Sequence, residues 1–113
     1  MDKLEKACEV AITECLAVGK DEVLLIIGDE PSRKIAYSFF NAGGKWAKEV
    51  ILVEIVPREI HGQEPPSAVA DMMKIVDVVI APTSTSISHT RARMEASLSG
   101  TRIATLPLSL IHI

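Results

Sequence analysis

The amino-acid sequence predicts an α/β fold in which a parallel sheet of about four strands carries helices on both faces. Four short runs rich in Val, Ile and Leu are continuous rather than alternating, which is typical of strands buried on both sides. Segments with helical spacing of apolar residues alternate with these runs. Strands that alternate with helices imply crossover connections, so the strands run in one direction in a Rossmann-like, three-layer arrangement.

The first element is a helix over residues 3–18, because apolar residues recur there at steps of three and four. Asp2 suits the N-cap, with Glu5 three residues later completing a capping box. Gly19 follows the last apolar position and is expected to take the left-handed conformation that ends many helices.

The remaining elements are bounded by proline and glycine. Pro31 fits the first turn of a helix that starts after the first strand and ends at Gly43, and Pro57 and Pro82 terminate strands. In the helix over 67–75, residues Ala68, Met72 and Ile75 are expected to face inward. The predicted strands are residues 22–28, 49–56, 76–81 and 102–106, and the last helix covers 91–99.

Composition limits the class of protein. The 113 residues suffice for one domain, and a net charge of −3 gives no general attraction for nucleic acid. The charged N-terminus lacks a signal-peptide pattern, and no apolar run reaches the roughly 20 residues that cross a bilayer. Cys8 and Cys15 are expected on the apolar face of the first helix as reduced thiols, which is typical of a cytoplasmic protein. Together with the charge and the absence of an apolar span, this predicts a cytoplasmic protein without membrane or nucleic-acid partners.

The six residues 108–113, Leu-Ser-Leu-Ile-His-Ile, fit this pattern poorly, since a polar loop and a further helix are expected after Pro107. They can be encoded by a string that matches a transposon-end adapter used in sequencing libraries. The hypothesis is therefore that 1–107 is the N-terminal α/β domain of a larger enzyme and 108–113 a non-native tail in which His112 has no function. The alternative is a genuine apolar C-terminal strand.

In a parallel sheet, ligands gather at the carboxyl ends of the strands. Polar loops at 28–33, 57–66 and 81–90 are expected there, and the segment 83–90 is rich in hydroxyls beside a helix start that could hold a carboxylate or phosphate. The alternative is that these residues cap helices or face solvent. The possible cleft-lining residues are Asp29, Arg33, Arg58, His61, Ser86, His89, Thr90 and Arg91.

Catalytic, cofactor-binding and metal-ligating residues are not predicted in this chain. The sequence has no glycine-rich dinucleotide fingerprint or phosphate loop, and its serines lack the nucleophile-elbow pattern. The potential ligands His61, Glu64, His89 and Glu95 do not have the spacing of a known metal motif, and a metal needs three or four converging groups.

Two segments resemble the N-terminal region of leucyl aminopeptidases of the aminopeptidase T type. They are Pro-Arg-Glu-Ile-His-Gly-Gln-Glu-Pro-Pro at 57–66 and Ser-Ile-Ser-His-Thr-Arg-Ala-Arg-Met-Glu-Ala at 86–96. The order of elements from Lys3 to Pro107 is similar as well, so the resemblance covers the chain except its tail.

The resemblance implies a metal-dependent exopeptidase that removes N-terminal residues from peptides with a centre of divalent metal ions. It places the metal ligands in the C-terminal part of the full enzyme, so none is assigned here, and it implies a homo-oligomer whose N-terminal part walls the cleft. The family is also similar to ring-opening dioxygenases that use iron. The alternatives are a fragment of such a dioxygenase, a non-catalytic α/β module that binds a small anionic ligand, and a domain that mediates assembly.

Overall fold

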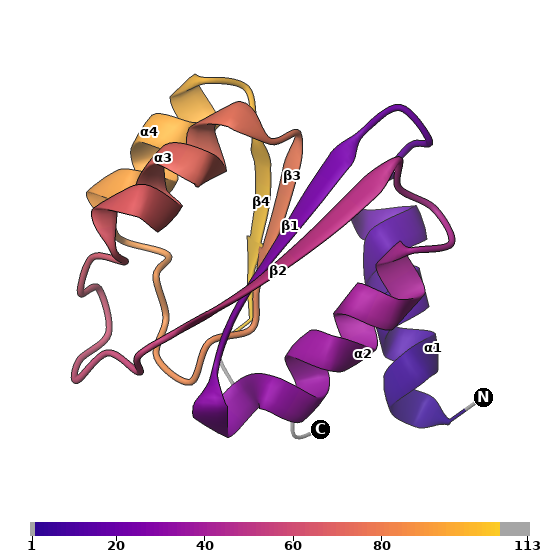
Figure 1. The fold of residues 1–113 in the computed structure, drawn as a ribbon, viewed down its shortest axis with the longest axis horizontal. Helices are drawn as coiled ribbons and strands as arrows, with labels where there is room; N and C mark the ends of the chain where they lie inside the picture. Colours follow the sequence, from indigo (N-terminus) through magenta and orange to yellow (C-terminus); the bar gives the residue numbers. More distant parts are fainter. Residues whose placement is uncertain (1, 107–113) are drawn as a thin grey trace.

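The computed structural model describes residues 2–106, and these form one four-stranded sheet with the order β2-β1-β3-β4. Every neighbouring pair of strands is parallel, which confirms the predicted fold class (Figure 1). The strands are β1 (Val23–Asp29), β2 (Glu49–Ile55), β3 (Val78–Ala81) and β4 (Arg102–Thr105). The tail proposed at 108–113 lies outside the described residues.

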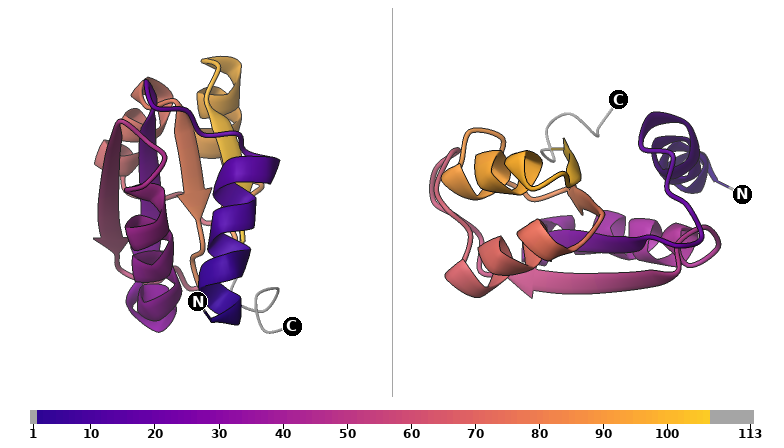
Figure 2. Two further views of the ribbon diagram at one scale, coloured as in Figure 1. Left: turned by 90° about the vertical axis from the view of Figure 1, so that its right-hand side faces the viewer. Right: turned by 90° about the horizontal axis from the view of Figure 1, so that it is seen from above.

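Each face of the sheet is covered by a pair of helices (Figures 1 and 2). Helices α1 (Lys3–Val10) and α2 (Arg33–Gly43) pack over the side chains of Leu24, Ile26, Val78 and Ile80. Helices α3 (Ser67–Ile75) and α4 (Arg91–Leu98) pack over the alternate residues of the same strands. Because successive strand residues point to opposite faces, the central strands are apolar throughout, as the continuous runs predicted.

The end of the first helix differs from the prediction. Its last turn, Ala11–Cys15, is a π-helix, and the left-handed residue is Ala17, with φ 48°, rather than Gly19. The N–H of Val18 donates to the carbonyl of Ile12 across this turn. The wider turn rotates the following residues, so Leu16 is buried while Cys15 is exposed. The prediction that both cysteines lie on the buried face is therefore wrong for Cys15. The Asp2 cap is confirmed, since its carboxylate accepts the N–H of Glu5 at 2.8 Å.

The buried face of α3 is centred one residue away from the predicted one, so of the three predicted residues only Met72 packs partly against the core. Val69 and Met73 are buried, whereas Ile75 is 82% exposed. One residue turns a helix by about 100°, which is enough to exchange the inward and outward stripes. The inward stripe is fixed after the helix by Thr101, whose hydroxyl contacts the carbonyl oxygens of Met73 and Val76 at 2.9 and 3.0 Å.

Candidate functional site at the carboxyl edge of the sheet

The order of the strands marks one place where a cleft can form. From β1 the chain passes to β2 on one side, and then crosses to β3 on the other side. In open α/β sheets, ligands bind at the carboxyl ends of the two strands where the winding reverses. Here those ends are Asp29 of β1 and Ala81 of β3.

Asp29 lies at this reversal point and is 1% exposed. Its Oδ1 accepts hydrogen bonds from the backbone N–H of Ser32, at 3.2 Å, and from the Ser32 hydroxyl, at 2.8 Å. Its Oδ2 accepts the backbone N–H of Ser84 at 2.9 Å and the Ser84 hydroxyl at 2.6 Å. With four donors on its two oxygens, the carboxylate is occupied by the protein's own groups, so it holds the loops after β1 and β3 together.

The loop after β2 and the loop after β3 are joined directly. We call residues 56–66 and 82–90 the rim loops. The backbone N–H of Ser86 donates to Nδ1 of His61 at 2.8 Å, and the N–H of Gly62 donates to the carbonyl of Ser86 at 2.9 Å. Gly62 has a φ of 86°, a left-handed conformation that a glycine adopts without strain. His61 and Ser86, which the sequence predicted at the cleft, are therefore direct neighbours.

Glu64 occupies the N-terminus of α4. Its two carboxylate oxygens accept the backbone N–H groups of Arg91, at 2.7 Å, and Ala92, at 3.0 Å. Thr90 is the N-cap, and its hydroxyl accepts the N–H of Arg93 at 3.1 Å. The expectation that free N–H groups at this helix start could hold an external anion is wrong, because a carboxylate of the chain itself takes that position.

A chain of hydroxyl groups continues from the rim loops to the last strand. The hydroxyl of Ser86 donates to that of Ser88 at 2.8 Å, and the Ser88 hydroxyl in turn contacts that of Thr105 in β4. All of these groups are at least partly covered. Together with the bonds made by Asp29 and His61, they connect all four strands at this edge, either directly or through the loops that follow them.

The arginines predicted at the cleft differ in their surroundings. Arg33 forms a two-pronged ion pair with Glu54, with N–O distances of 2.8 and 2.7 Å. This hydrogen bonding raises the pKa of Arg33 and lowers the pKa of Glu54. Arg58 is partly covered, and its Nε has no hydrogen-bond partner among the described residues, as is also true of the Thr85 hydroxyl.

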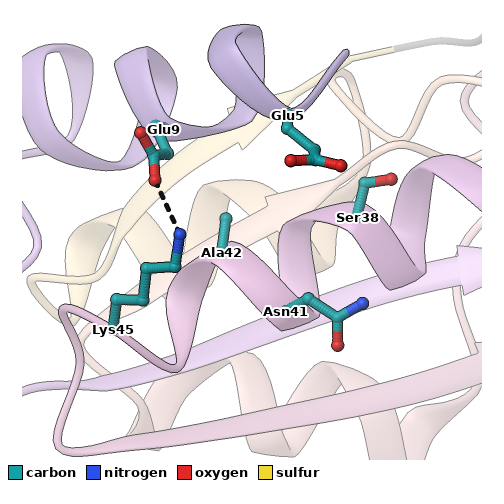
Figure 3. Close-up of a pocket in the computed structure, with 6 residues that line it drawn as sticks. All are labelled: Glu5, Glu9, Ser38, Asn41, Ala42 and Lys45. Atoms are coloured by element: carbon teal, nitrogen blue, oxygen red, sulfur yellow. Dashed lines mark hydrogen bonds and ion pairs between the residues drawn. The ribbon is translucent and has the colours of Figure 1, made fainter. Parts of the chain in front are cut away.

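His89 and Arg91 are exposed and line an open hollow of about 380 Å³ together with Ser88, Thr90, Arg93 and Met94. A second hollow of about 480 Å³ adjoins it between α3 and α4, where Glu64, Arg91 and Glu95 supply the charged groups. Both hollows lie beside the start of α4. A third hollow, of about 130 Å³, lies away from this edge between α1 and α2, where Glu9 pairs with Lys45 at 3.0 Å (Figure 3).

The residues between 2 and 106 contain no group of three or more His, Cys, Asp or Glu side chains that could hold a metal ion. The divalent metal ions that the family resemblance implies therefore do not fit the described residues. Within the same range, no helix is long and apolar enough to cross a membrane.

Sequence reasoning misses the two residues that organise the edge. In the sequence, Ser84 is one of several hydroxyls, and Glu64 attracts attention only as a potential metal ligand. Glu64 caps a helix that begins 27 positions further along the chain, so no local pattern in the sequence marks it as a cap. Comparison with known proteins adds no assignment, because no family model and no curated protein matches this chain.

Proposed function

We propose that the chain forms the N-terminal wall of the substrate cleft in a metal-dependent aminopeptidase, which releases N-terminal residues from peptides. The metal ligands and the reacting groups belong to a further part of that enzyme. The full-length enzyme would be a cytoplasmic homo-oligomer.

One structural relationship carries this proposal. The two segments that resemble aminopeptidases, 57–66 and 86–96, are separated in the sequence but are bonded to each other through His61, Ser86 and Glu64. On the 86–96 side each of these bonds is donated by a backbone N–H, so the contact depends on the side chains of His61 and Glu64 and on the path of the second segment. The resemblance therefore falls on a single three-dimensional unit at the edge where ligands of parallel sheets bind.

The described residues would contribute shape and position rather than reacting groups. Asp29 and Glu64 are engaged by backbone N–H donors, so their geometry is fixed and their oxygens hold loops in place. The exposed side chains beside them, such as those of His89 and Arg91, are available to contact a substrate. Such groups improve catalysis by orienting the substrate.

The second candidate is a non-catalytic module that binds a small anion, and the basic hollow at the start of α4 favours it. The position of Glu64 disfavours it, since the helix N–H groups are already satisfied. The third candidate is a fragment of an iron-dependent ring-cleaving dioxygenase. It differs from the first candidate only in the metal and the reacting groups, which the proposal places in another part of the enzyme.

The test is to recover the coding sequence downstream of Pro107, express the extended protein with its divalent metal, and measure release of N-terminal residues from short peptides. We expect turnover by the extended protein, and neither stoichiometric metal nor turnover by the 113-residue chain. Oxidative ring opening of an aromatic compound with iron and dioxygen, in place of peptide cleavage, would support the dioxygenase. Stoichiometric metal and peptide cleavage by the shorter chain would overturn the assignment of the metal site to another part.

A further inference from the structure

The hollow at the start of α4 combines basic side chains with a hydroxyl and an apolar wall. His89, Arg91 and Arg93 are exposed and line it, with Ser88 and Met94 beside them. It is a shallow hollow of about 380 Å³ that is broadly open to solvent. The chain as a whole carries a net charge of −3, so this concentration of positive charge is local to one place on the rim.

The basic side chains of this hollow are not engaged in ion pairs within residues 2–106. The ion pairs formed there use Arg33, Lys45, Lys74 and Arg102. The carboxylate of Glu64 is held by the backbone of α4 and lines the neighbouring hollow on the other side of Arg91. Arg91 also lines the hollow that contains Glu64 and Glu95, whereas Arg93 lines only the basic hollow. The guanidinium of Arg93 is therefore the arginine group that an anion meets apart from those carboxylates.

The position of Glu64 also changes the kind of anion site that this can be. Since Glu64 covers the first N–H groups of α4, an incoming anion must be recognised by side chains. Guanidinium groups present their N–H donors in a planar fork that matches the two oxygens of a carboxylate. The partly apolar wall at Met94, which is 56% exposed, suits a ligand whose charge sits next to an aliphatic or aromatic group.

We propose that this basic hollow binds the C-terminal carboxylate of a short peptide, with Arg93 on the carboxylate and Met94 against the last side chain. This inference rests on the proposed function, because it places the C-terminus of the peptide substrate at the rim loops that would wall the substrate cleft. Inorganic phosphate is also an anion but has no apolar group next to its charge. The affinities of the hollow for phosphate and for the peptide therefore distinguish the two ligands.

The experiment is a set of three NMR titrations of the 113-residue chain. The ligands are an N-acetylated tripeptide that ends in leucine with a free carboxylate, the same tripeptide with an amidated C-terminus, and inorganic phosphate. We expect the free carboxylate to shift the amide resonances of 88–94 and to bind about tenfold more tightly than the amide, a typical effect of losing one charge-assisted contact. Phosphate is expected to bind more weakly than the tripeptide.

Arg93→Gln should remove the preference for the carboxylate. Lys48→Gln is the matched control, because Lys48 is exposed, carries the same charge, and lies just before β2 at the opposite edge of the sheet. Unchanged folding is checked by the dispersion of the spectrum. Equal binding of the acid and the amide, tighter binding of phosphate, or full binding by Arg93→Gln would each overturn the inference.

These outcomes are independent of the test of the proposed function. Binding is measured on the 113-residue chain without turnover, whereas the aminopeptidase assay uses the extended protein. A chain that binds the tripeptide while the extended protein releases no N-terminal residue would retain the carboxylate site and refute the aminopeptidase. Turnover without such binding would do the reverse.

Discussion

Ser84 donates both its backbone N–H and its hydroxyl to a single oxygen of Asp29, at 2.9 and 2.6 Å. The two residues are 55 positions apart in the chain, yet each lies at or just beyond the end of one of the two central strands. The other Asp29 oxygen is bonded to Ser32. One buried carboxylate therefore fixes the start of the helical turn after β1 and the loop after β3 at the same time.

Asp29→Asn is expected to lower the free energy of unfolding by about 3 kcal/mol, because a buried donor left without its charged acceptor is costly. Asparagine has one oxygen, so its NH₂ group must face the N–H of either Ser32 or Ser84. Urea denaturation measures the loss. Glu30→Gln is the control, since Glu30 is exposed beside it. An Asp29→Asn variant as stable as the parent protein would show that the carboxylate charge is not needed.

His61→Leu is expected to loosen the junction between the rim loops, because Nδ1 accepts the N–H of Ser86. Hydrogen exchange at the Ser86 amide should accelerate about fivefold, corresponding to about 1 kcal/mol for one hydrogen bond. His61→Asn offers an oxygen near the place of Nδ1 and should retain most of the protection. If Leu and Asn gave the same exchange rate, the hydrogen bond would not hold the loops.

Ala17→Gly is expected to stabilise the protein by about 1 kcal/mol, because Ala17 has a φ of 48°, a left-handed conformation that strains any residue with a Cβ and that glycine adopts freely. The gain is reduced by the greater freedom of glycine in the unfolded chain. Gly19→Ala is the control, since a Cβ there meets only ordinary contacts at 3.7 Å or more. Thermal denaturation of both variants checks the prediction, and a lower melting temperature for Ala17→Gly would contradict it.

Glu22 should contribute a pH-dependent part of the stability. Hydrogen bonding from Arg102, with N–O distances of 2.6 and 2.9 Å, lowers the pKa of Glu22 to about 2, with a further contribution from the N–H of Gly19. A carboxyl group whose pKa is lowered by folding stabilises the folded state at pH values above its pKa in the unfolded chain, which is near 4.5. This stabilisation is lost as the pH falls towards 2.

Urea denaturation between pH 5 and about pH 2 should therefore show a smaller decrease in stability for Glu22→Gln than for the parent protein. Arg102→Gln should flatten the pH dependence in the same way, because it removes the main cause of the lowered pKa. Added salt should weaken the effect, since both side chains are partly exposed. Parallel curves for all three proteins would contradict this assignment.

The sheet and its direction could be predicted because the strands carry apolar residues on both faces, and this pattern does not depend on distant contacts. The ends and faces of helices were harder. The left-handed residue is Ala17, two positions before Gly19, and the π-helical turn that precedes it leaves no periodic signal in the sequence. Ile75 points outward, and the carbonyl groups of Met73 and Val76 on either side of it are bonded by Thr101, which lies in a later segment.

The edge that carries the candidate site could be predicted from topology alone, since every strand ends there. The partners at that edge could not, because a hydrogen bond between residues such as Glu64 and Arg91 depends on how two loops meet. The sequence shows a carboxylate and a helix start, and either could have faced solvent. Whether the carboxylate meets the helix start depends on how the two loops pack, and the spacing of residues within one loop does not show this.

The interlocked rim loops also set an order of events during synthesis. The loop that contains His61 and Glu64 cannot reach its final shape until residues 86–92 have left the ribosome, since its partners are there. Asp29 can bond to Ser84 only after a further 55 residues have been synthesised. The two helices on the α1 side can cover β1 and β2 early, whereas the rim loops are completed last. A pause in translation after β2 would therefore leave the rim loops unformed on a partly built sheet.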